Sequence, residues 1–475
     1  MIPNLLVCLP FILAIAIFFC GPHRRMARWL LIACGGVHTA LVAAAFILRH
    51  QANLDATWFT LSFADPIQTT ILAVTSIGFL AVSLHTSVWL PWTFAIETQR
   101  DDAKFMRETT FLACMAAFLG SMSMVILANN FGLLWVAIEA TTLFSAPLIC
   151  FHLNAESIEA MWKYLLLCSV GIGFALFGTM LMAYSAQLGG TAEATLNFQV
   201  LSEHAKSFDP IWFKAAFVFI VAGYGTKMGL APFHTWLPDA HSESPAIVSA
   251  LLSGSLLNCA FLAITRFRAI APATLEPFCD QLMIGLGVFS IAVAAIFIIR
   301  QHDYKRMLGY SSLENMGLII ILFALGSRFL TAHIFFHSLI KMSLFVIAGN
   351  ILLGYGTRDI GGVRGLLAHK PVTAVLWIVG ILLIAGMPPS PLFFTELSLI
   401  AQSSHLLGGT LLTLLFIVFC GLTRLMINMV MGPKPELAPE PRRLPGRLSV
   451  LPAFGLAIAL ITGLFFCFLS FDFTS

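Results

Sequence analysis

Residues 223–246 read GYGTKMGLAPFHTWLPDAHSESPA, a stretch that joins an apolar helix to charged and helix-breaking residues. Lys227 lies in the apolar half, and Pro232 follows five residues later. A charged side chain in hydrocarbon costs between ~2.5 and more than 10 kcal/mol, depending on how the cost is measured. Proline leaves a backbone carbonyl unpaired, and broken helices at mid-membrane are a usual place for transported ions to be handled. The stretch therefore predicts a broken membrane helix that carries a buried lysine.

The composition is typical of an integral membrane protein. Of the 475 residues, 59% are hydrophobic and 10% are charged, against roughly 25% charged in ordinary soluble domains. Apolar runs of about 18 or more residues, each long enough to span ~30 Å of hydrocarbon, recur along the chain with short polar loops between them. We expect one all-α, polytopic membrane domain over residues 1–475, embedded in the lipid bilayer, with no soluble domain and no nucleic-acid partner.

The hydropathy pattern predicts about fourteen transmembrane helices. The first apolar run lacks a basic segment before it and is followed by Arg24 and Arg25, so we expect a retained span rather than a cleaved signal peptide. The predicted helices are centred near residues 12, 38, 81, 118, 141, 172, 221, 256, 289, 317, 342, 387, 419 and 459.

The basic residues predict the orientation of the chain. With the N-terminus outward, about seventeen of them fall in inward loops and about six in outward loops, and inward loops of membrane proteins are enriched in lysine and arginine. Both termini are therefore expected to lie outside the cytoplasm, in a multi-pass protein of the inner or plasma membrane. The inward set is Arg24, Arg25, Arg28, Arg100, Lys104, Arg107, Lys163, Arg300, Lys305, Arg306, Arg358, Arg364, Lys370, Lys434, Arg442, Arg443 and Arg447, and the outward set is Arg49, Lys206, Lys214, Arg266, Arg268 and Arg328.

The cysteines predict no metal or redox centre. None of the ten forms a CxxC pair, and iron–sulfur and zinc sites need clustered thiolates. The sequence also lacks a GxGxxG or P-loop fingerprint in a strand-to-helix context. We expect no cofactor in this chain, so that any redox chemistry belongs to a partner.

Several charged residues lie inside predicted spans. Glu139, in NNFGLLWVAIEATTLFSAPLI, is about ten residues from either end of its span, too deep for a short side chain to snorkel. It is either a protonated carboxyl bonded to a neighbouring helix or an ionisable group in a proton or ion path, and we favour the path. A pair of Glu139 and Lys227 would change its protonation state on separating, whereas a structural pair would not. Arg424 is within snorkelling reach of the inward surface, which favours a structural role.

The stretch TAHIFFHSLIKMSLFVIAGN places three titratable groups on one helix face. His333, His337 and Lys341 are spaced i, i+4 and i+8, over roughly 12 Å of helix. A lone histidine there would more often be a helix–helix hydrogen-bond donor. Because imidazole both accepts and donates near neutral pH, three such groups in a row favour a lateral proton relay.

A second predicted break lies in AGMPPSPLFFTELSL, where Pro388, Pro389 and Pro391 interrupt an apolar run and Glu396 follows. Two interrupted helices, each with a buried charge, are typical of transporters built from repeats, although no letter-for-letter repeat is visible here.

Two further groups of polar residues each have two alternative roles. Glu314, in DYKRMLGYSSLENMGLI, lies about three turns from an inward loop, and structural and titrating roles remain alternatives. His234, Asp239, His241 and Glu243 crowd the end of the first break. Metal ligation is one interpretation of these four residues, but the neighbouring prolines favour a polar vestibule.

The stretch GYGTKMGLAPFHTWLPDAHSESPAIVSALLSG resembles the signature of the antiporter-like, proton-translocating subunits of respiratory complex I, Mrp-type antiporters and membrane-bound hydrogenases. Supporting motifs follow in the family's order over most of the chain: Trp135 to Glu139, EAMWKYLL from Glu159, DYKRMLGYSS from Asp303, HSLIKMSLFVIAGN from His337 and PPSPLFFTE from Pro388.

The resemblance implies fourteen helices with two inverted five-helix repeats, at roughly residues 109–265 and 279–431. It also implies that Glu139 and Lys227 are the family's paired glutamate and lysine, and that Lys341 and Glu396 are its later relay and exit groups. The sequence ends just after the fourteenth predicted helix, so the long lateral-helix extension of the family's most distal subunit is not expected.

Two positions depart from the family pattern. Asn258, in LLSGSLLNCAF, stands where the family often has lysine, and Asn315, in SSLENMG, where it often has histidine. Asparagine orients water but does not titrate, so Glu314 becomes the candidate for the missing titratable group. The pattern LLNCAF with SLEN resembles the F component of hydrogenase-4 and related formate-hydrogenlyase-type complexes.

Together these features predict a proton-conducting subunit of an oxidoreductase complex, such as a complex I-like NADH dehydrogenase or a hydrogenase-4 assembly. Its expected partners are other membrane subunits and a peripheral redox arm, whose electron transfer drives the protons. The alternatives in the same fold are an Mrp-type cation/proton antiporter subunit and the membrane subunit of a proton-coupled inorganic-carbon uptake complex. A membrane anchor whose buried charges no longer conduct is the alternative from another class.

Overall fold

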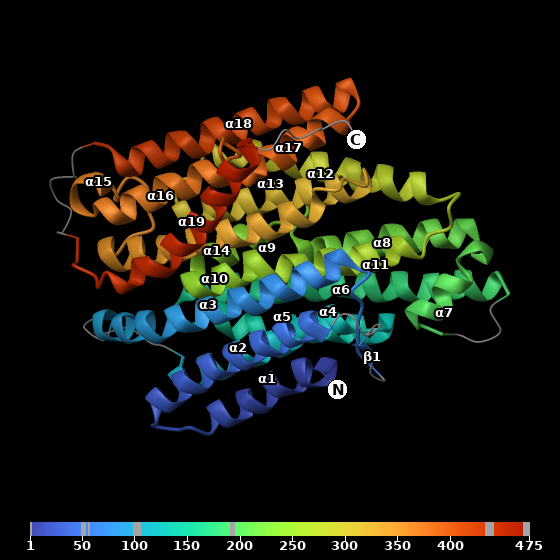
Figure 1. Ribbon diagram of the computed structural model, residues 1–475, viewed down its shortest axis with the longest axis horizontal. Helices are drawn as coiled ribbons and strands as arrows, with labels where there is room; N and C mark the ends of the chain where they lie inside the picture. Colours follow the sequence, from blue (N-terminus) through green and yellow to red (C-terminus); the bar gives the residue numbers. More distant parts are fainter. Residues whose placement is uncertain are drawn as a thin grey trace. The chain divides into compact units, whose positions relative to one another are not determined.

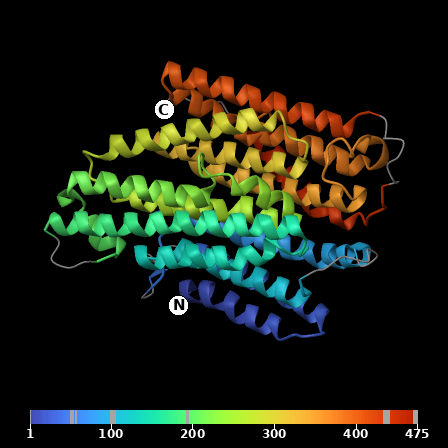
Figure 2. The same cartoon turned by 180° about the vertical axis from the view of Figure 1, so that it is seen from behind.

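The computed structural model describes residues 2–48, 54–55, 58–97, 106–190, 195–432 and 441–468, nearly all of them helical (Figures 1 and 2). Two short strands, β1 (Leu54–Asp55) and β2 (Thr60–Leu61), form an antiparallel pair. Four residues of the orientation argument, Arg49, Arg100, Lys104 and Lys434, lie outside the described residues.

The all-α polytopic fold predicted from the sequence is confirmed. Within the described residues, 12 helices are long and apolar enough to cross a membrane, and two shorter apolar helices, Ile2–Phe18 and Pro371–Ile384, accompany them. Twelve and two make fourteen, the predicted number. The helix predicted near residue 387 is the interrupted one, since its centre falls in the break after Ile384.

The chain divides into two compact units. Unit 1 consists of Met1–Leu80, Phe105–Trp236 and Ser255–Leu286. Besides the strands, it contains α1 (Ile2–Phe18), α2 (Arg24–Ile47), α4 (Glu108–Leu127), α5 (Phe131–Ile149), α6 (Ala155–Leu188), α7 (Phe198–Glu203), the 3-10 turn η2 (Ala205–Ser207), α8 (Pro210–Met228) and α11 (Leu257–Ala269).

Unit 2 consists of Ala81–Lys104, Leu237–Gly254 and Gly287–Ser475. It contains α9 (Trp236–Glu243) from Leu237 on, α10 (Ala246–Leu251), α13 (Tyr304–Ala324), α14 (Leu330–Tyr355), α15 (Leu366–His369), α16 (Pro371–Ile384), α17 (Pro391–Gln402), α18 (His405–Val430) and α19 (Arg447–Phe468). Helices α3 (Pro66–Glu97) and α12 (Glu276–Ile298) and the π-helical turn η3 (Leu252–Leu256) contribute residues to both units.

Polar residues in the short loops determine where several helices begin. Asn130, Asn154, Asp209, Asp303 and Ser390 each accept a hydrogen bond from a backbone N–H in the first turn of the helix that follows. This cap satisfies donors that would otherwise be unpaired at a helix start. The starts of α5, α6, α8, α13 and α17 are therefore encoded locally.

The first predicted break is present. Helix α8 ends at Met228, and Gly229 adopts a left-handed conformation with φ of 82°. The Ala231–Pro232 peptide bond is cis, and α9 begins four residues after Pro232. Lys227 thus lies in the last turn of α8, immediately before the break.

The second predicted break is also present. Helix α16 ends at Ile384, Gly386 has a φ of +67°, and Ser390 caps α17. The Pro388–Pro389 peptide bond is cis. Glu396 follows in the second turn of α17 and is 8% exposed.

Glycine allows α6 and α8 to pack unusually closely. A Cβ atom on Gly223 of α8 would lie 2.5 Å from the Ala175 nitrogen and 2.6 Å from the Gly171 carbonyl oxygen of α6. Small residues let membrane helices approach in this way. Lys227 is one turn beyond Gly223 on the same face, so the close approach brings its side chain against α6.

The contact between α6 and α8 can be tested with two alanine substitutions. Gly223→Ala is expected to lower the free energy of unfolding by about 1–3 kcal/mol, because the added methyl group meets the α6 backbone. Gly173→Ala, on the same pair of helices, is the control: its Cβ atom would meet nothing within 4 Å. Thermal unfolding in detergent measures both, and equal melting temperatures would contradict the packing described here.

Candidate functional site

The first buried charge is the ammonium group of Lys227 in unit 1. The side chain has no exposed surface. Its Nζ atom donates hydrogen bonds to Thr142 Oγ1 at 2.9 Å and to Tyr164 Oη at 2.5 Å, and it lies 4.5 Å from the centroid of the Tyr164 ring. Two hydroxyls and an aromatic face therefore solvate this charge from α5 and α6.

Tyr164 continues the hydrogen bonding away from the lysine. Its hydroxyl is 2.5 Å from Ser145 Oγ, and Ser145 in turn donates to the Thr141 carbonyl oxygen at 2.6 Å. With Tyr164 donating to Ser145, every link from ammonium to carbonyl has one donor and one acceptor. Lys227 thus begins an ordered chain of hydroxyls that crosses from α8 through α6 to α5.

Glu139 does not receive the hydrogen bonds of Lys227. It is half-buried on α5, and its Oε1 atom accepts a hydrogen bond from Ser169 of α6 at 3.0 Å. Its Oε2 atom has no hydrogen-bond partner within the described residues. The carboxylate and the ammonium interact electrostatically, while Thr142, one turn from Glu139 on α5, makes the direct contact with the lysine. The two residues of the predicted pair are therefore not in direct hydrogen-bond or ion-pair contact within the described residues.

The second buried charge is the ammonium group of Lys341 in unit 2. Lys341 is fully buried on α14 and donates to the Leu308 carbonyl oxygen of α13 at 2.7 Å. Glu314, on the same α13 helix and 2% exposed, interacts with it electrostatically. Unit 2 thus repeats the combination found in unit 1: a buried lysine with a neutral oxygen ligand and a nearby carboxylate.

Asn315 orients the Glu314 carboxylate. Its Nδ2 atom donates to Glu314 Oε2 at 2.7 Å and to the Ser311 carbonyl oxygen at 2.9 Å. The amide that replaces the family's usual histidine therefore serves as a hydrogen-bond donor to the neighbouring acid. Asn258, at the other departure, is fully buried at the start of α11 and follows the π-helical turn η3; such turns are frequent at functional sites.

The histidines of α14 extend from Lys341 toward α17. His333 and His337 are fully buried on this helix, and His333 Nδ1 lies 2.7 Å from Thr395 Oγ1 of α17. In the part of the chain that the structure describes, His333 Nε2 and both ring nitrogens of His337 have no hydrogen-bond partner. Three ring nitrogens along this face of α14 are thus unpaired within the described residues.

Glu396 lies beside Thr395 at the second break. Its carboxylate packs against Gly386, where a Cβ atom would overlap Glu396 Oε2. It also interacts electrostatically with Glu314 of α13. Lys341, Glu314, the two histidines and Glu396 therefore form one buried polar group that involves α13, α14 and α17.

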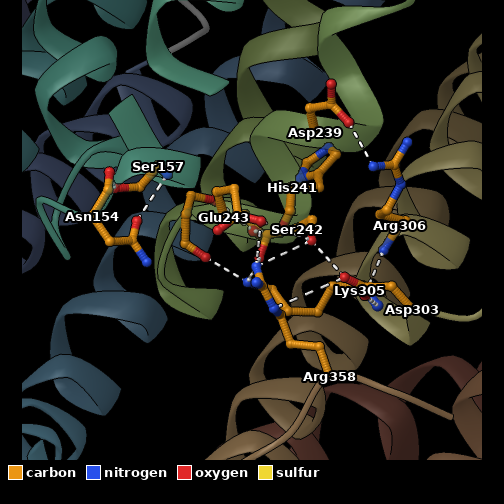
Figure 3. Close-up of polar contacts among 12 residues, drawn as sticks. Asn154, Ser157, Asp239, His241, Ser242, Glu243, Asp303, Lys305, Arg306 and Arg358 are labelled. Carbon is orange, nitrogen blue, oxygen red and sulfur yellow. Dashed lines mark hydrogen bonds and ion pairs between the residues drawn. The ribbon is translucent and has the colours of Figure 1, made fainter. Parts of the chain in front are cut away.

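A third cluster fixes the end of α9 (Figure 3). Asp239 pairs with Arg306 of α13 at 2.8 Å, and Glu243 pairs with Arg358, which follows α14, at 2.6 Å. Because both carboxylates are in ion pairs, they are poor candidates for metal ligands, and within the described ranges no three His, Cys, Asp or Glu side chains are arranged to hold a metal ion. His241 between them is fully buried and stacks on Phe345, with ring centroids 4.7 Å apart.

Lys305 belongs to the same cluster. It is 1% exposed, and its Nζ atom donates to the carbonyl oxygens of Ser242 at 2.8 Å and Ser244 at 2.5 Å (Figure 3). Asp303 caps α13 and also accepts from Ser242 Oγ at 2.5 Å. Cations stabilise the carbonyl end of a helix, so Lys305 fixes the C-terminal end of the half-helix α9.

Sequence reasoning missed Tyr164, Thr142 and Lys305. Tyr164 belongs to the motif EAMWKYLL, whose single tyrosine in an apolar run was a signal for a buried hydroxyl. Lys305 was counted among the inward loop cations, which is wrong: it is buried in the first turn of α13, next to the acidic cap Asp303. Arg424, by contrast, is exposed on α18, in keeping with a side chain that snorkels.

The family of the chain follows from its sequence. The family model described as "NADH:quinone oxidoreductase/Mrp antiporter, TM" matches residues 128–423, more than half of the chain. The chain belongs to this family. The matched segment contains both breaks, both buried lysines and the cluster at the end of α9.

Individual relatives come from different complexes. A hydrogenase-4 component F homolog from Methylacidiphilum infernorum is 38% identical over 293 residues, which cover 60% of this chain and 62%, less than two thirds, of that relative. NADH-quinone oxidoreductase subunit N from Paraburkholderia phymatum is 25% identical over 435 residues, covering 88% of this chain and 85% of the relative.

Among solved structures, the Mrp complex from Dietzia sp. DQ12-45-1b contains a chain with a similar fold. The TM-score is 0.84 at 18% sequence identity, and the match covers 98% of this chain and 94% of that one. This likeness shows the fold, and the family match identifies the chain as a multi-pass, antiporter-like membrane protein.

The role of Lys305 as an anchor predicts a large effect on stability. Lys305→Met is expected to lower the free energy of unfolding by about 3–5 kcal/mol, because it leaves the buried carbonyl oxygens of Ser242 and Ser244 without their charged donor. Lys206→Met, an exposed lysine of η2, is the control and should change it by less than about 0.5 kcal/mol. Denaturation in detergent compares the two, and indistinguishable stabilities would show that Lys305 does not hold α9.

Proposed function

We propose that this chain conducts protons across the membrane as a subunit of a redox-driven complex, of the hydrogenase-4/formate-hydrogenlyase type or the complex I-like NADH dehydrogenase type. The observation that carries the proposal is the occurrence of two buried lysines, Lys227 and Lys341, each bonded to neutral oxygens and each coupled to a carboxylate. A buried ammonium with a nearby acid changes protonation state when that acid gains or loses charge. Each lysine is therefore a site that loads and releases a proton.

The groups around the lysines favour protons over metal cations. Thr142, Tyr164 and Ser145 supply hydroxyls that both donate and accept, and His333 and His337 supply ring nitrogens that do the same. Metal cations such as Ca²⁺ or Mg²⁺ instead require about six oxygen ligands around one point. The 38% identity with a hydrogenase-4 component F homolog supports a partner that carries the redox centres.

An Mrp-type cation/proton antiporter subunit is the second candidate. The shared fold with a chain of the Mrp complex supports it. The two candidates differ in what drives the protons: electron transfer in a partner, or an opposing gradient of Na⁺ or another cation. Proton flux that requires an added cation gradient and no electron donor would identify the antiporter, and flux coupled to bicarbonate uptake would identify an inorganic-carbon complex.

The surroundings of Glu139 support membrane partners. Ser169, its hydrogen-bond donor, is exposed on α6 between the exposed side chains of Leu166 and Val170. A carboxylate and a hydroxyl in the middle of an apolar membrane face are costly next to lipid. We infer that another membrane subunit covers this face.

From the distribution of basic residues we further infer that the complex lies in the plasma or inner membrane, with both termini of this chain outside the cytoplasm.

Removal of the first lysine tests the proposed function. Lys227→Ala is expected to abolish proton translocation while leaving assembly intact, because it removes the ammonium that begins the hydroxyl chain. The assembled complex would be placed in vesicles and proton uptake followed with a pH-sensitive dye, with Lys206→Ala as the control at an exposed position. Normal pumping by the Lys227 variant would remove this residue from the path.

The departures from the family pattern allow a second test. Glu314→Gln is expected to stop proton flux because it removes a titratable group, whereas Asn258→Leu should only slow it by removing an amide that orients water. Both side chains are buried, so flux is compared at matched levels of assembled complex. The opposite ranking would show that Glu314 only packs its helix.

A further inference from the structure

Six basic residues of unit 2 gather where three chain segments meet. Lys370 Nζ donates to the Arg442 carbonyl oxygen at 2.6 Å, and the Arg442 backbone nitrogen donates to the Gly354 carbonyl oxygen at 2.9 Å. These bonds join the start of α16 to the segment before α19. Helix α15, which directly precedes α16, is drawn at the same end of unit 2 (Figure 1). We call the following residues the basic cluster: Arg364, His369, Lys370, Arg442, Arg443 and Arg447.

The arginines of the basic cluster lack acidic partners. Arg364, Arg442, Arg443 and Arg447 are exposed, and none of them forms an ion pair with another described residue. Three other arginines of the predicted inward set are in ion pairs: Arg28 with Glu108, Arg306 with Asp239 and Arg358 with Glu243. Among the described residues, the arginines of the basic cluster therefore have no acidic side chain paired with them.

Helix ends add to this charge. Helix α16 begins at Pro371 and α19 at Arg447, so the N-termini of both helices lie among the cationic side chains. The N-terminus of a helix carries about half a positive charge and unpaired N–H donors, and anions are stabilised there. No side chain of the described residues caps α16.

Exposed apolar side chains lie directly beside the cations. Val372 is 62% exposed and Val375 50% exposed on the first turns of α16, and Val450 is 65% exposed and Phe454 67% exposed on the first turns of α19. Helices α16 and α19 are apolar, and α19 is long enough to cross a membrane. Cations at the head of an apolar helix face match the two parts of a phospholipid, the charged headgroup and the acyl chains.

We propose that the basic cluster binds the headgroup of an anionic phospholipid, whose acyl chains lie along the exposed faces of α16 and α19. The exposed valines and Phe454 favour a lipid over an acidic protein. A phospholipid whose headgroup contacts the cations also places its acyl chains against these apolar side chains, whereas an acidic protein docked at the water-facing ends of the helices would contact the cations alone. Basic pockets between membrane helices are known to hold such headgroups. The proposal depends on the charge of this surface and not on the proton path.

Binding of cardiolipin and phosphatidylglycerol to the purified complex tests the proposal. Titration in detergent, with bound lipid counted by native mass spectrometry, would compare the parent with Arg443→Gln/Arg447→Gln. Each basic residue near a membrane surface contributes roughly a factor of five to anionic lipid binding, so the double variant should bind at least about tenfold more weakly. Phosphatidylcholine should bind equally weakly to both.

Arg25→Gln/Arg300→Gln is the matched control, because it removes two exposed arginines that also lack ion pairs within the described residues. Its lipid affinity should equal that of the parent. Equal affinities of all three proteins would overturn the proposal, as would displacement of the lipid by excess inorganic phosphate, which would indicate a simple anion site. Loss of a co-purifying subunit from the Arg443/Arg447 variant, with lipid affinity unchanged, would assign the surface to a protein partner instead.

Discussion

The ammonium group of Lys227 is fully buried and has to be solvated by side chains instead of water, and the packing of α5, α6 and α8 meets this requirement. Hydroxyls of Thr142 and Tyr164 replace water around the charge. For Tyr164 to reach the lysine, α6 and α8 must pack closely, which the absence of a side chain at Gly223 permits. The break after Met228 ends α8 directly beyond the lysine, so the charged residue sits at a helix end where the backbone is already irregular.

Unit 2 meets the same requirement with different groups. The Leu308 carbonyl oxygen of α13 takes the place of the hydroxyls around Lys341, and Glu314 supplies the nearby acid. Around this centre, polar groups appear at the places where regular helix ends: Thr395 and Glu396 follow the second break, and the ion pairs of Asp239 and Glu243 fix the end of α9. Buried charge and interrupted helix thus occur together in both units.

The sequence was sufficient for the helices and for the positions of the buried charges. Apolar runs of membrane length have one stable conformation in lipid, because the backbone must bond within the helix, and a charge in such a run is visible in the letters alone. The partners of those charges were not predictable. Lys227 contacts Thr142 and Tyr164 rather than Glu139, and the contact depends on how closely α6 and α8 approach, which the local sequence does not specify.

The burial of Lys305 was likewise not predictable from the local sequence. A lysine beside a short polar loop is usually exposed, and from the sequence Lys305 is expected in such a loop. In the fold, α9 ends directly against the start of α13, and the ammonium group is enclosed by the Ser242 and Ser244 carbonyls. Only the tertiary contact between two segments about sixty residues apart decides that this lysine is buried.

The central claim is that the buried lysine of each unit takes part in proton translocation. The most direct test is proton flux in vesicles containing the assembled complex with Lys341→Ala, at matched expression and with partner electron transfer or cation exchange driven as in the parent. The account predicts that proton flux is lost, because the substitution removes the ammonium group that loads and releases the proton in unit 2. A variant that keeps the parent flux would show that Lys341 takes no part in translocation, and would contradict the account.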